Sequence, residues 1–283
     1  MILEHEIPQG SKLYFKQNAK IKREIENVAS TLLFDNGYEE IVTPLFSYHQ
    51  HHSISDEKEL VRVNDEKNHN ISLRADSTVD VVRLIQKRLG RNTTQKKWFY
   101  IQPVYTYPTN ECYQIGVENI GSENLDEMAN LSMQILKRFD INPLLQISNI
   151  KIPKILSEQF SELELDDFKH INIDKILSLN IDWLKKLVYL QYENQLDELI
   201  EIVPKYLKNE LIKLKNFVKN VSYENLVIAP LYYSKMLYYE ELFFRVIENN
   251  SVYARGGEYK VDNQTSVGFA IYTDELLERV GKK

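Results

Sequence analysis

The sequence predicts an α+β fold, in which a mixed, mainly antiparallel sheet is flanked by helices. Three observations support this. A long amphipathic helix precedes a short strand near the N-terminus, and two antiparallel strand pairs follow before residue 121. A stretch rich in Leu, Ile, Lys and Glu then interrupts the strand pattern, which resumes afterwards. We therefore expect a single core over residues 1–283 with a helical insertion at about 155–222.

The first element is a helix over residues 12–36. Its apolar side chains recur at helical spacing, at Ile21, Ile25, Val28, Ala29, Leu32 and Leu33. Gly37 follows, at the position where a left-handed residue commonly ends a helix. Residues 38–42 predict a strand that stops at Pro44, because proline cannot donate a ladder hydrogen bond and favours strand ends or sheet edges.

Two strand pairs come next. Residues 61–64 and 70–74 flank a polar turn and predict a hairpin. An apolar helix is expected to begin near Thr78. Residues 98–105 and 113–120 predict a second antiparallel pair, so strands dominate this part of the chain.

The second half begins and ends with strands around the helical stretch. Ser122 is expected to cap a helix that runs to about Phe139. Within residues 160–220 only Pro204 interrupts the helical periodicity. The elements expected after it are strands at 238–247, 251–253 and 266–271 and a final helix at 273–280.

Composition limits the function classes. The hydrophobic share of 43% and charged share of 27% are ordinary for a globular protein. No apolar run reaches the ~18 residues of a membrane span, and no secretory signal is visible. The single cysteine, Cys112, fits a reducing, cytoplasmic location. The net charge of −6 makes general nucleic-acid binding unfavourable, so no tRNA partner is expected.

Several short segments resemble histidyl-tRNA synthetases, a family with the class II aminoacyl-tRNA synthetase core. In chain order they are Leu73-Arg-Ala-Asp-Ser-Thr78, Gln114-Ile-Gly-Val-Glu-Asn-Ile-Gly121, Leu226-Val-Ile-Ala-Pro-Leu-Tyr-Tyr233, Ala254-Arg-Gly-Gly-Glu-Tyr259 and Val267-Gly-Phe-Ala-Ile271. Each is weak evidence alone, but five in the family's order over residues 10–280 make the resemblance strong. The helix, strand and Pro44 near the N-terminus resemble class II motif 1, which implies self-association through that region. The chain ends soon after the last match, so no anticodon-binding domain is expected.

Three positions depart from the family where it holds arginine. They are Thr106, Ile228 and Glu275. Arginine grips phosphate through a planar fork of donors that these residues lack, and each lost charged hydrogen bond costs ~1.5–3 kcal/mol. The three losses together predict ~10³-fold or weaker nucleotide binding. The chain is therefore not expected to be a synthetase.

A core without these arginines resembles the regulatory subunits of ATP phosphoribosyltransferase. The resemblance implies a non-catalytic chain that binds and activates a short-form catalytic subunit and mediates feedback inhibition by histidine, in the first step of histidine biosynthesis. The alternative is a minimal amino-acid-activating enzyme related to histidyl-tRNA synthetase. A free-standing histidine sensor with another partner is a third hypothesis.

The resemblance also implies a histidine pocket. Asp76, Gln114 and Glu118 match positions that hold the α-amino group, and carboxylate and carbonyl oxygens suit an ammonium. Tyr232 and Tyr233 match the pair beside the imidazole. The alternative is that all five residues serve only as scaffold, since Asp76 is shorter than the family's glutamate and tyrosines commonly fill cores.

The histidines near residue 50, the glycine pair at 256–257 and Cys112 give weaker indications of function. His49, His51 and His52 lie in a polar loop and lack a zinc-like ligand pattern, so no metal and no cofactor are expected. Gly256 and Gly257 either let the backbone approach a ligand or form a turn. Cys112 lies beside Glu111, which disfavours a thiolate, so we do not expect a nucleophile.

Overall fold

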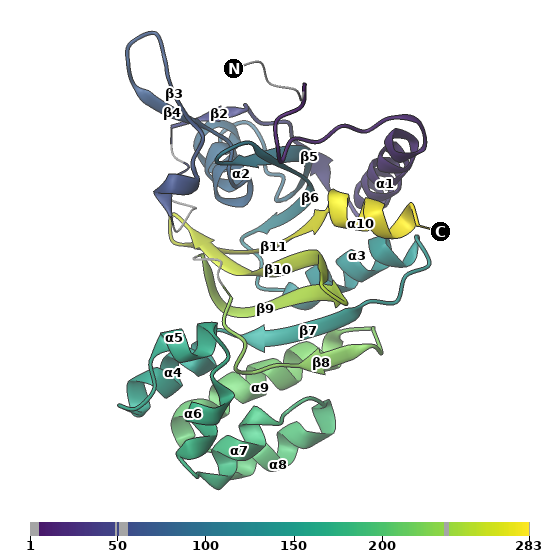
Figure 1. The fold of residues 1–283 in the computed structure, drawn as a ribbon. Helices are drawn as coiled ribbons and strands as arrows, with labels where there is room; N and C mark the ends of the chain where they lie inside the picture. Colours follow the sequence, from purple (N-terminus) through teal and green to yellow (C-terminus); the bar gives the residue numbers. More distant parts are fainter. Residues whose placement is uncertain (1–5, 49, 51–55, 235–237, 283) are drawn as a thin grey trace. The chain divides into compact units, whose positions relative to one another are not determined.

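The structure is a computed structural model that describes residues 6–48, 50, 56–234 and 238–282 (Figure 1). The chain divides into two units, Met1–Gly121 with Val261–Lys283 as unit 1, and Ser122–Lys260 as unit 2. Helices and a mainly antiparallel set of strands occur in both, which confirms the α+β class. The single core with one insertion at about 155–222 stays a prediction.

Among the described residues, unit 1 combines three α-helices with two groups of strands. Its helical elements are α1 (Lys16–Asp35), the 3-10 turn η2 (Glu57–Glu59), α2 (Thr78–Leu84), the π-helical turn η3 (Ile85–Leu89) and α10 (Thr273–Val280). Its strands are β1 (Glu39–Glu40), β2 (Phe46–Ser47), β3 (Arg62–Asn64), β4 (Asn70–Leu73), β5 (Lys97–Thr106), β6 (Asn110–Ile120) and β11 (Gln264–Tyr272).

The N-terminal helix follows the predicted pattern. In α1 the side chains of Ile21, Ile25, Ala29 and Leu33 are buried, one apolar stripe of an amphipathic helix. The helix ends before Gly37, whose φ of +79° is the left-handed conformation expected there. The following strand is shorter than predicted.

Strand order in unit 1 is β1-β5-β6-β11, with β1 parallel to β5 and the other pairs antiparallel. The register places Tyr100 of β5 and Ala270 of β11 on either side of Gly116 in β6. It places Trp98 and Gly268 on either side of Glu118 in the same way. The smaller group, β2-β4-β3, contains the predicted hairpin.

Unit 2 holds most of the helices. They are α3 (Leu125–Lys137), α4 (Lys151–Gln159), α5 (Leu165–Lys169), α6 (Ile173–Ser178), α7 (Asp182–Val188), the 3-10 turn η4 (Glu193–Gln195), α8 (Leu196–Ile202) and α9 (Lys205–Asn220). Its strands are β7 (Leu144–Asn149), β8 (Leu226–Ile228), β9 (Tyr239–Glu248) and β10 (Ser251–Val261), in the order β10-β9-β7-β8. Within this unit α9 packs against β7 (Figure 1).

Several local predictions for unit 2 need correction. Ser122 is not the cap of α3, because the helix begins later, after Asn124, and the Ser122 hydroxyl instead accepts from the Asn124 N–H at 3.2 Å. Pro204 does separate two helices, since it precedes the first residue of α9. The strand β7 was not predicted. In the part of the chain that the structure describes, no helix combines the length and apolarity of a membrane span.

Candidate functional site

The loop ahead of α2 is held by one buried side chain. Gln50 Oε1 accepts from the backbone N–H groups of Ala75 at 2.8 Å and Asp76 at 2.7 Å, and Gln50 Nε2 donates to the Asp76 carbonyl at 3.0 Å. Asp76 Oδ1 also accepts from the Val79 N–H at 3.4 Å, in the first turn of α2. The half-buried Asp76 carboxylate is thus placed by its backbone and by the helix start. Sequence reasoning missed Gln50, because no local pattern marks a partner so distant along the chain.

Glu118 and Tyr100 form a buried acid–phenol pair on the sheet of unit 1. Tyr100 is fully buried, and its hydroxyl donates to Glu118 Oε1 at 3.2 Å and lies 3.3 Å from Thr78 Oγ1. Burial raises the pKa of Tyr100 well above its usual value, and the charges of Glu118 and Asp76 raise it further. Two of the predicted residues therefore act on the same phenol, Glu118 through a hydrogen bond and Asp76 through its charge.

Two glycines make room for this pair. A Cβ at Gly116 would lie 1.9 Å from Tyr100 Cζ, and a Cβ at Gly268 would lie 2.0 Å from Glu118 Oε2. Only glycine therefore fits at these two places on the strands. Gly116 lies within the segment that resembled the synthetases, so its role gives that resemblance a physical cause.

Gln114 lies on the same face of β6 as Glu118, because alternate residues of a strand share a face. It is half-buried and lies directly opposite Gln102 of β5. Both ends of the Gln102 amide are hydrogen-bonded within the protein. Its Nε2 donates to Ser77 Oγ at 3.1 Å, and its Oε1 accepts from the Thr43 hydroxyl at 3.1 Å. Gln114 is the member of this amide pair that is more exposed.

Arg74, two residues before Asp76, donates to backbone carbonyls. Arg74 donates to the carbonyl oxygens of Thr43 and Pro44, each at 3.1 Å, and of Pro103 at 2.9 Å. Burial lowers the pKa of Arg74. Its guanidinium acts as a structural clamp, so these donors are not directed at a phosphate.

Tyr232 and Tyr233 lie in unit 2. Tyr232 packs on Phe243, with ring centroids 5.9 Å apart, and carries the Arg245 guanidinium 3.9 Å from its ring centroid. Tyr233 is half-buried against a cluster that contains Ile150 and Phe243. Both tyrosines therefore pack against aromatic residues of unit 2, and the ring of Tyr232 also contacts a cation.

The three replaced positions have distinct places. Thr106 ends β5 and pairs with Asn110 across the turn to β6. Ile228 is 1% exposed in β8 and lies opposite Ile147, so it belongs to the core of unit 2. Glu275 lies in the first turn of α10. None of the three side chains carries positive charge.

The remaining sequence predictions concern metals, Cys112 and the glycine pair. The part of the chain that the structure describes contains no cluster of three or more His, Cys, Asp or Glu side chains suited to a metal, while His49, His51 and His52 lie outside the described residues. Burial, followed by the charge of Asp274, raises the pKa of Cys112 to about 11.

Gly256 and Gly257 lie inside β10 rather than in a turn. A Cβ at Gly257 would lie 2.6 Å from the Tyr239 ring, so this glycine serves packing.

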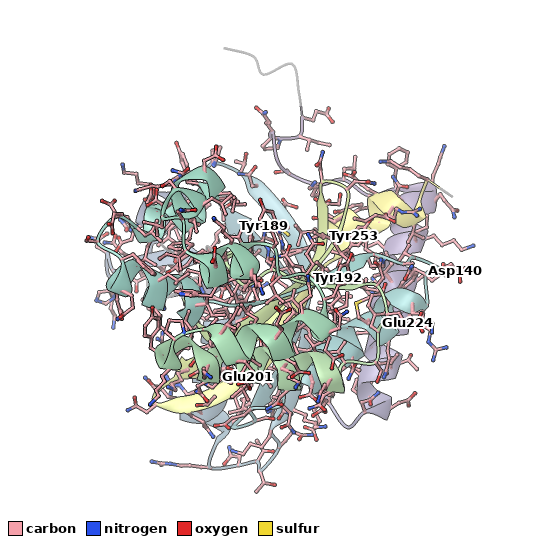
Figure 2. The ribbon with its side chains drawn as sticks, turned by 90° about the horizontal axis from the view of Figure 1, so that it is seen from below. Asp140, Tyr189, Tyr192, Glu201, Glu224 and Tyr253 are labelled. Atoms are coloured by element: carbon pink, nitrogen blue, oxygen red, sulfur yellow. The ribbon has the colours of Figure 1, made fainter. Side chains whose placement is uncertain are left out.

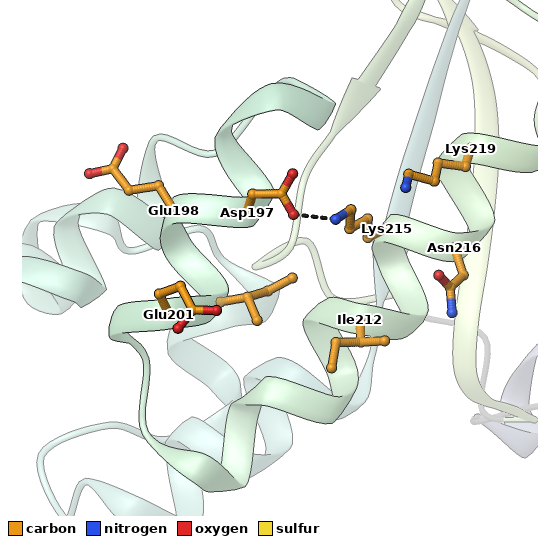
Figure 3. Close-up of a pocket in the computed structure, with 8 residues that line it drawn as sticks. Asp197, Glu198, Glu201, Ile212, Lys215, Asn216 and Lys219 are labelled. Carbon is orange, nitrogen blue, oxygen red and sulfur yellow. Dashed lines mark hydrogen bonds and ion pairs between the residues drawn. The ribbon is translucent and has the colours of Figure 1, made fainter.

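A hollow lies between α8 and α9 in unit 2. It measures about 570 Å³ and is lined by Asp197, Glu198 and Glu201 on one side and by Lys215 and Lys219 on the other (Figure 3). Lys215 forms an ion pair with Asp197. Because opposite charges line its two walls, this groove favours neither an anionic nor a cationic ligand. Tyr189 and Tyr192, which precede α8 in the chain and are labelled in Figure 2, are exposed.

Comparison with known families gives a consistent result. Residues 14–276 match the family model of histidyl-tRNA synthetase. The chain is 44% identical over 280 residues to an ATP phosphoribosyltransferase regulatory subunit of Wolinella succinogenes, covering 99% of this chain and 97% of the relative. It is also 44% identical over 278 residues to the subunit of the same name from Helicobacter hepaticus, covering 98% and 99%.

Solved structures support the fold. A Bacillus halodurans protein described as an ATP phosphoribosyltransferase regulatory subunit/histidyl-tRNA synthetase matches with a TM-score of 0.87 at 20% identity, over 99% of this chain and 84% of that one. Histidyl-tRNA synthetase from Nostoc matches with a TM-score of 0.80 at 14% identity, over 99% and 76%. At these identities the likeness concerns the fold alone.

Proposed function

The chain belongs to the histidyl-tRNA synthetase family and, within it, to the ATP phosphoribosyltransferase regulatory subunits, and on this premise we propose how it acts. It is a non-catalytic subunit that binds a short-form ATP phosphoribosyltransferase catalytic subunit and activates it. Histidine is its effector, and neither tRNA nor a membrane is a partner. Activation arises when this subunit stabilises the active arrangement of its partner.

The observation that carries the non-catalytic role is that none of the three positions matching the family's arginines holds a basic side chain. Thr106 and Glu275 supply no donor fork, and Ile228 is a core side chain. The guanidinium of Arg74 donates its hydrogen bonds to three backbone carbonyls. Adenylate formation requires positive charge to stabilise the transferring phosphorus, so this core is unsuited to it.

The proposed effector site uses the acceptors gathered in unit 1. Asp76 and Gln114 are half-buried and meet a ligand ammonium directly, while the buried Glu118 adds negative charge and orients the Tyr100 hydroxyl. An ammonium donates three hydrogen bonds and therefore suits a group that consists of acceptors. Tyr232 and Tyr233 stay a separate prediction for the imidazole side. Histidine inhibits by binding one arrangement of the complex better than another.

Self-association is proposed through the motif 1 region of unit 1. The side chain of Val42 is 81% exposed and that of Phe46 is 54% exposed, and Phe34 at the end of α1 is 52% exposed. β1 is an edge strand, and in the sequence it lies between Phe34 and Val42. Clustered exposed apolar side chains mark interaction surfaces in globular proteins.

Reconstitution with the short catalytic subunit tests the proposal. The two chains are expected to copurify, the catalytic rate to rise on mixing, and histidine to lower the rate of the mixture. Failure to copurify and to activate would overturn the regulatory role. Histidine-dependent exchange between ATP and pyrophosphate by this chain alone would establish the amino-acid-activating alternative instead.

Single variants test the effector site. Asp76→Asn and Gln114→Leu each remove an acceptor for a charged donor, so histidine binding measured by calorimetry on the complex should weaken by ~10-fold or more. Tyr232→Leu and Tyr233→Leu enter the same titration to test the imidazole side. Asp35→Asn, at an exposed carboxylate, is the matched control. Unchanged histidine affinity in both acceptor variants would locate the effector elsewhere.

A substitution that introduces a charge tests the proposed self-association surface. Val42→Glu should lower the sedimentation mass of the isolated chain, because it places a charge in the proposed contact. Ile171→Glu, at another exposed apolar residue (57% exposed), is the control and should leave the mass unchanged. An unchanged mass for Val42→Glu would exclude this surface.

A further inference from the structure

The groove between α8 and α9 carries opposite charges on its two walls. Asp197, Glu198 and Glu201 of α8 form its acidic wall, and Lys215 and Lys219 of α9 form its basic wall (Figure 3). All of these side chains except that of Lys215 are exposed. A protein that fits this groove must therefore present an acidic stripe and a basic stripe side by side.

Apolar side chains line the same groove. Ile212 of α9 is 42% exposed, and Ile200 of α8 is half-buried. Ile202, the last residue of α8, is 43% exposed. Covering such side chains removes apolar surface from water, which favours association. Apolar residues accompanied by charged ones that stay near water are typical of contacts between proteins.

The charges of the two walls are only partly neutralised within the chain. Lys215 pairs with Asp197 across the groove, and Glu198 pairs with a lysine of α7. Among the residues that the structure describes, no ion pair joins Glu201 or Lys219 to an opposite charge. Each wall therefore keeps a charge that a second molecule can neutralise. Exposed ion pairs stabilise a protein little, so the existing pairs can exchange partners at small cost.

This chain itself presents the two stripes that the groove requires. A two-fold axis along the groove sets the acidic wall of one copy over the basic wall of the other, and symmetry repeats the contact. A two-fold axis across the groove would set like charges on one another, so charge selects the first arrangement. We propose that the α8–α9 groove binds a second copy of this chain through this two-fold contact.

The proposed contact is separate from the motif 1 surface. Its helices belong to unit 2, whereas Val42 and Phe46 belong to unit 1. A chain that uses both surfaces associates beyond a dimer, and loss of one contact leaves the dimer made by the other. Two short helices offer a small surface, so we expect association that depends on concentration over ~10–500 µM.

Reversing the charge of one wall at a time tests the contact. One variant combines Glu198→Lys with Glu201→Lys, so that both walls are net basic, and the other combines Lys215→Glu with Lys219→Glu, so that both are acidic. In sedimentation equilibrium of the full chain, each variant alone should associate ~10-fold or more weakly through like-charge repulsion. Added salt should weaken association of the parent.

Mixing the two variants gives the sharper result. Association should return in an equimolar mixture, because each acidic wall then faces a basic wall. A chain with all four substitutions exchanges the two walls and should associate as the parent does. Both results also require folded variants, so a loss of mass caused by unfolding would be recognised.

The controls make the same changes of net charge at exposed residues of unit 2 outside the groove. They combine Glu158→Lys with Glu162→Lys, and Lys137→Glu with Lys169→Glu. Both controls should sediment as the parent does.

Three outcomes would overturn the proposal. These are parental mass in both wall variants, reduced masses that the mixture does not restore, and equal losses of mass in the controls. If the wall variants keep the parental mass but no longer copurify with the catalytic subunit, the groove belongs to that partner and not to a second copy. None of these results concerns activation by the parent chain, so failure here leaves the proposed function in place.

Discussion

The side chain of Glu258 should make the stability of unit 2 depend on pH. Glu258 lies in β10, and burial raises its pKa from 4.5 to about 7, with the charge of Glu241 acting in the same direction. Between these two values the folded chain keeps a proton that the unfolded chain releases. Stability must therefore fall as pH rises from about 4.5 to about 7, and it then levels off.

The size of the effect follows from the two pKa values. The gap between 4.5 and about 7, at ~1.36 kcal/mol per pKa unit, corresponds to roughly 3 kcal/mol. Glu258→Gln removes the titration while keeping nearly the same shape. The variant should exceed the parent's free energy of unfolding by no more than ~1 kcal/mol at pH 5 and by up to ~3 kcal/mol at pH 8.

Urea unfolding at pH 5 and pH 8 measures both chains under the same ionic strength. Glu224→Gln, at an exposed glutamate of the same unit, is the control and should change by no more than ~0.5 kcal/mol at either pH. Parallel pH profiles for the parent and Glu258→Gln would refute the reasoning, since the carboxyl would then titrate alike in the folded and unfolded chain.

Three further predictions rest on unit 1. Gly116→Ala should lower the free energy of unfolding by ~3 kcal/mol or more in urea melts, because its Cβ would meet the fully buried Tyr100 ring. Gly37→Ala has open space but a left-handed backbone and should cost only ~1–2 kcal/mol. A cost for Gly116→Ala no larger than that for Gly37→Ala would contradict the packing argument. Gln50→Leu leaves the N–H groups of Ala75 and Asp76 without their acceptor and should cost ~2–4 kcal/mol, with faster hydrogen exchange at those two amides. Cys112, whose pKa is raised from 9.0 to about 11, should react with iodoacetamide at pH 8 about 100-fold more slowly than an unperturbed thiol, and a rate equal to that of glutathione would contradict the pKa.

Local patterns predicted much of the secondary structure. The apolar stripe of α1, the pair β5 and β6, the helices on both sides of Pro204, and α10 over Thr273–Val280 all form as expected. Each depends on residues a few positions apart, and periodicity reports such relations directly. The start of α3 and the strand β7 were missed, because a capping residue and a buried apolar strand have weak local signals.

The candidate site was predictable only in part. Asp76, Gln114 and Glu118 were found through the resemblance. Gln50, which holds the backbone of Asp76, and Tyr100, which donates to Glu118, were not. The groove between α8 and α9 was likewise invisible, because it depends on how the two helices pack. A sequence pattern gives the apolar face of each helix but not which helix lies beside it.

By itself, the sequence determined the fold class, the family resemblance and the loss of arginine at positions 106, 228 and 275. The tertiary structure alone decided what those changes mean. It places Ile228 in the core and directs Arg74 to backbone carbonyls. It also shows that the Glu118–Tyr100 pair fits only because Gly116 and Gly268 carry no side chain. The physical reason is that periodicity is local, while charge, burial and hydrogen bonding depend on side chains that only the folded sheet brings into contact.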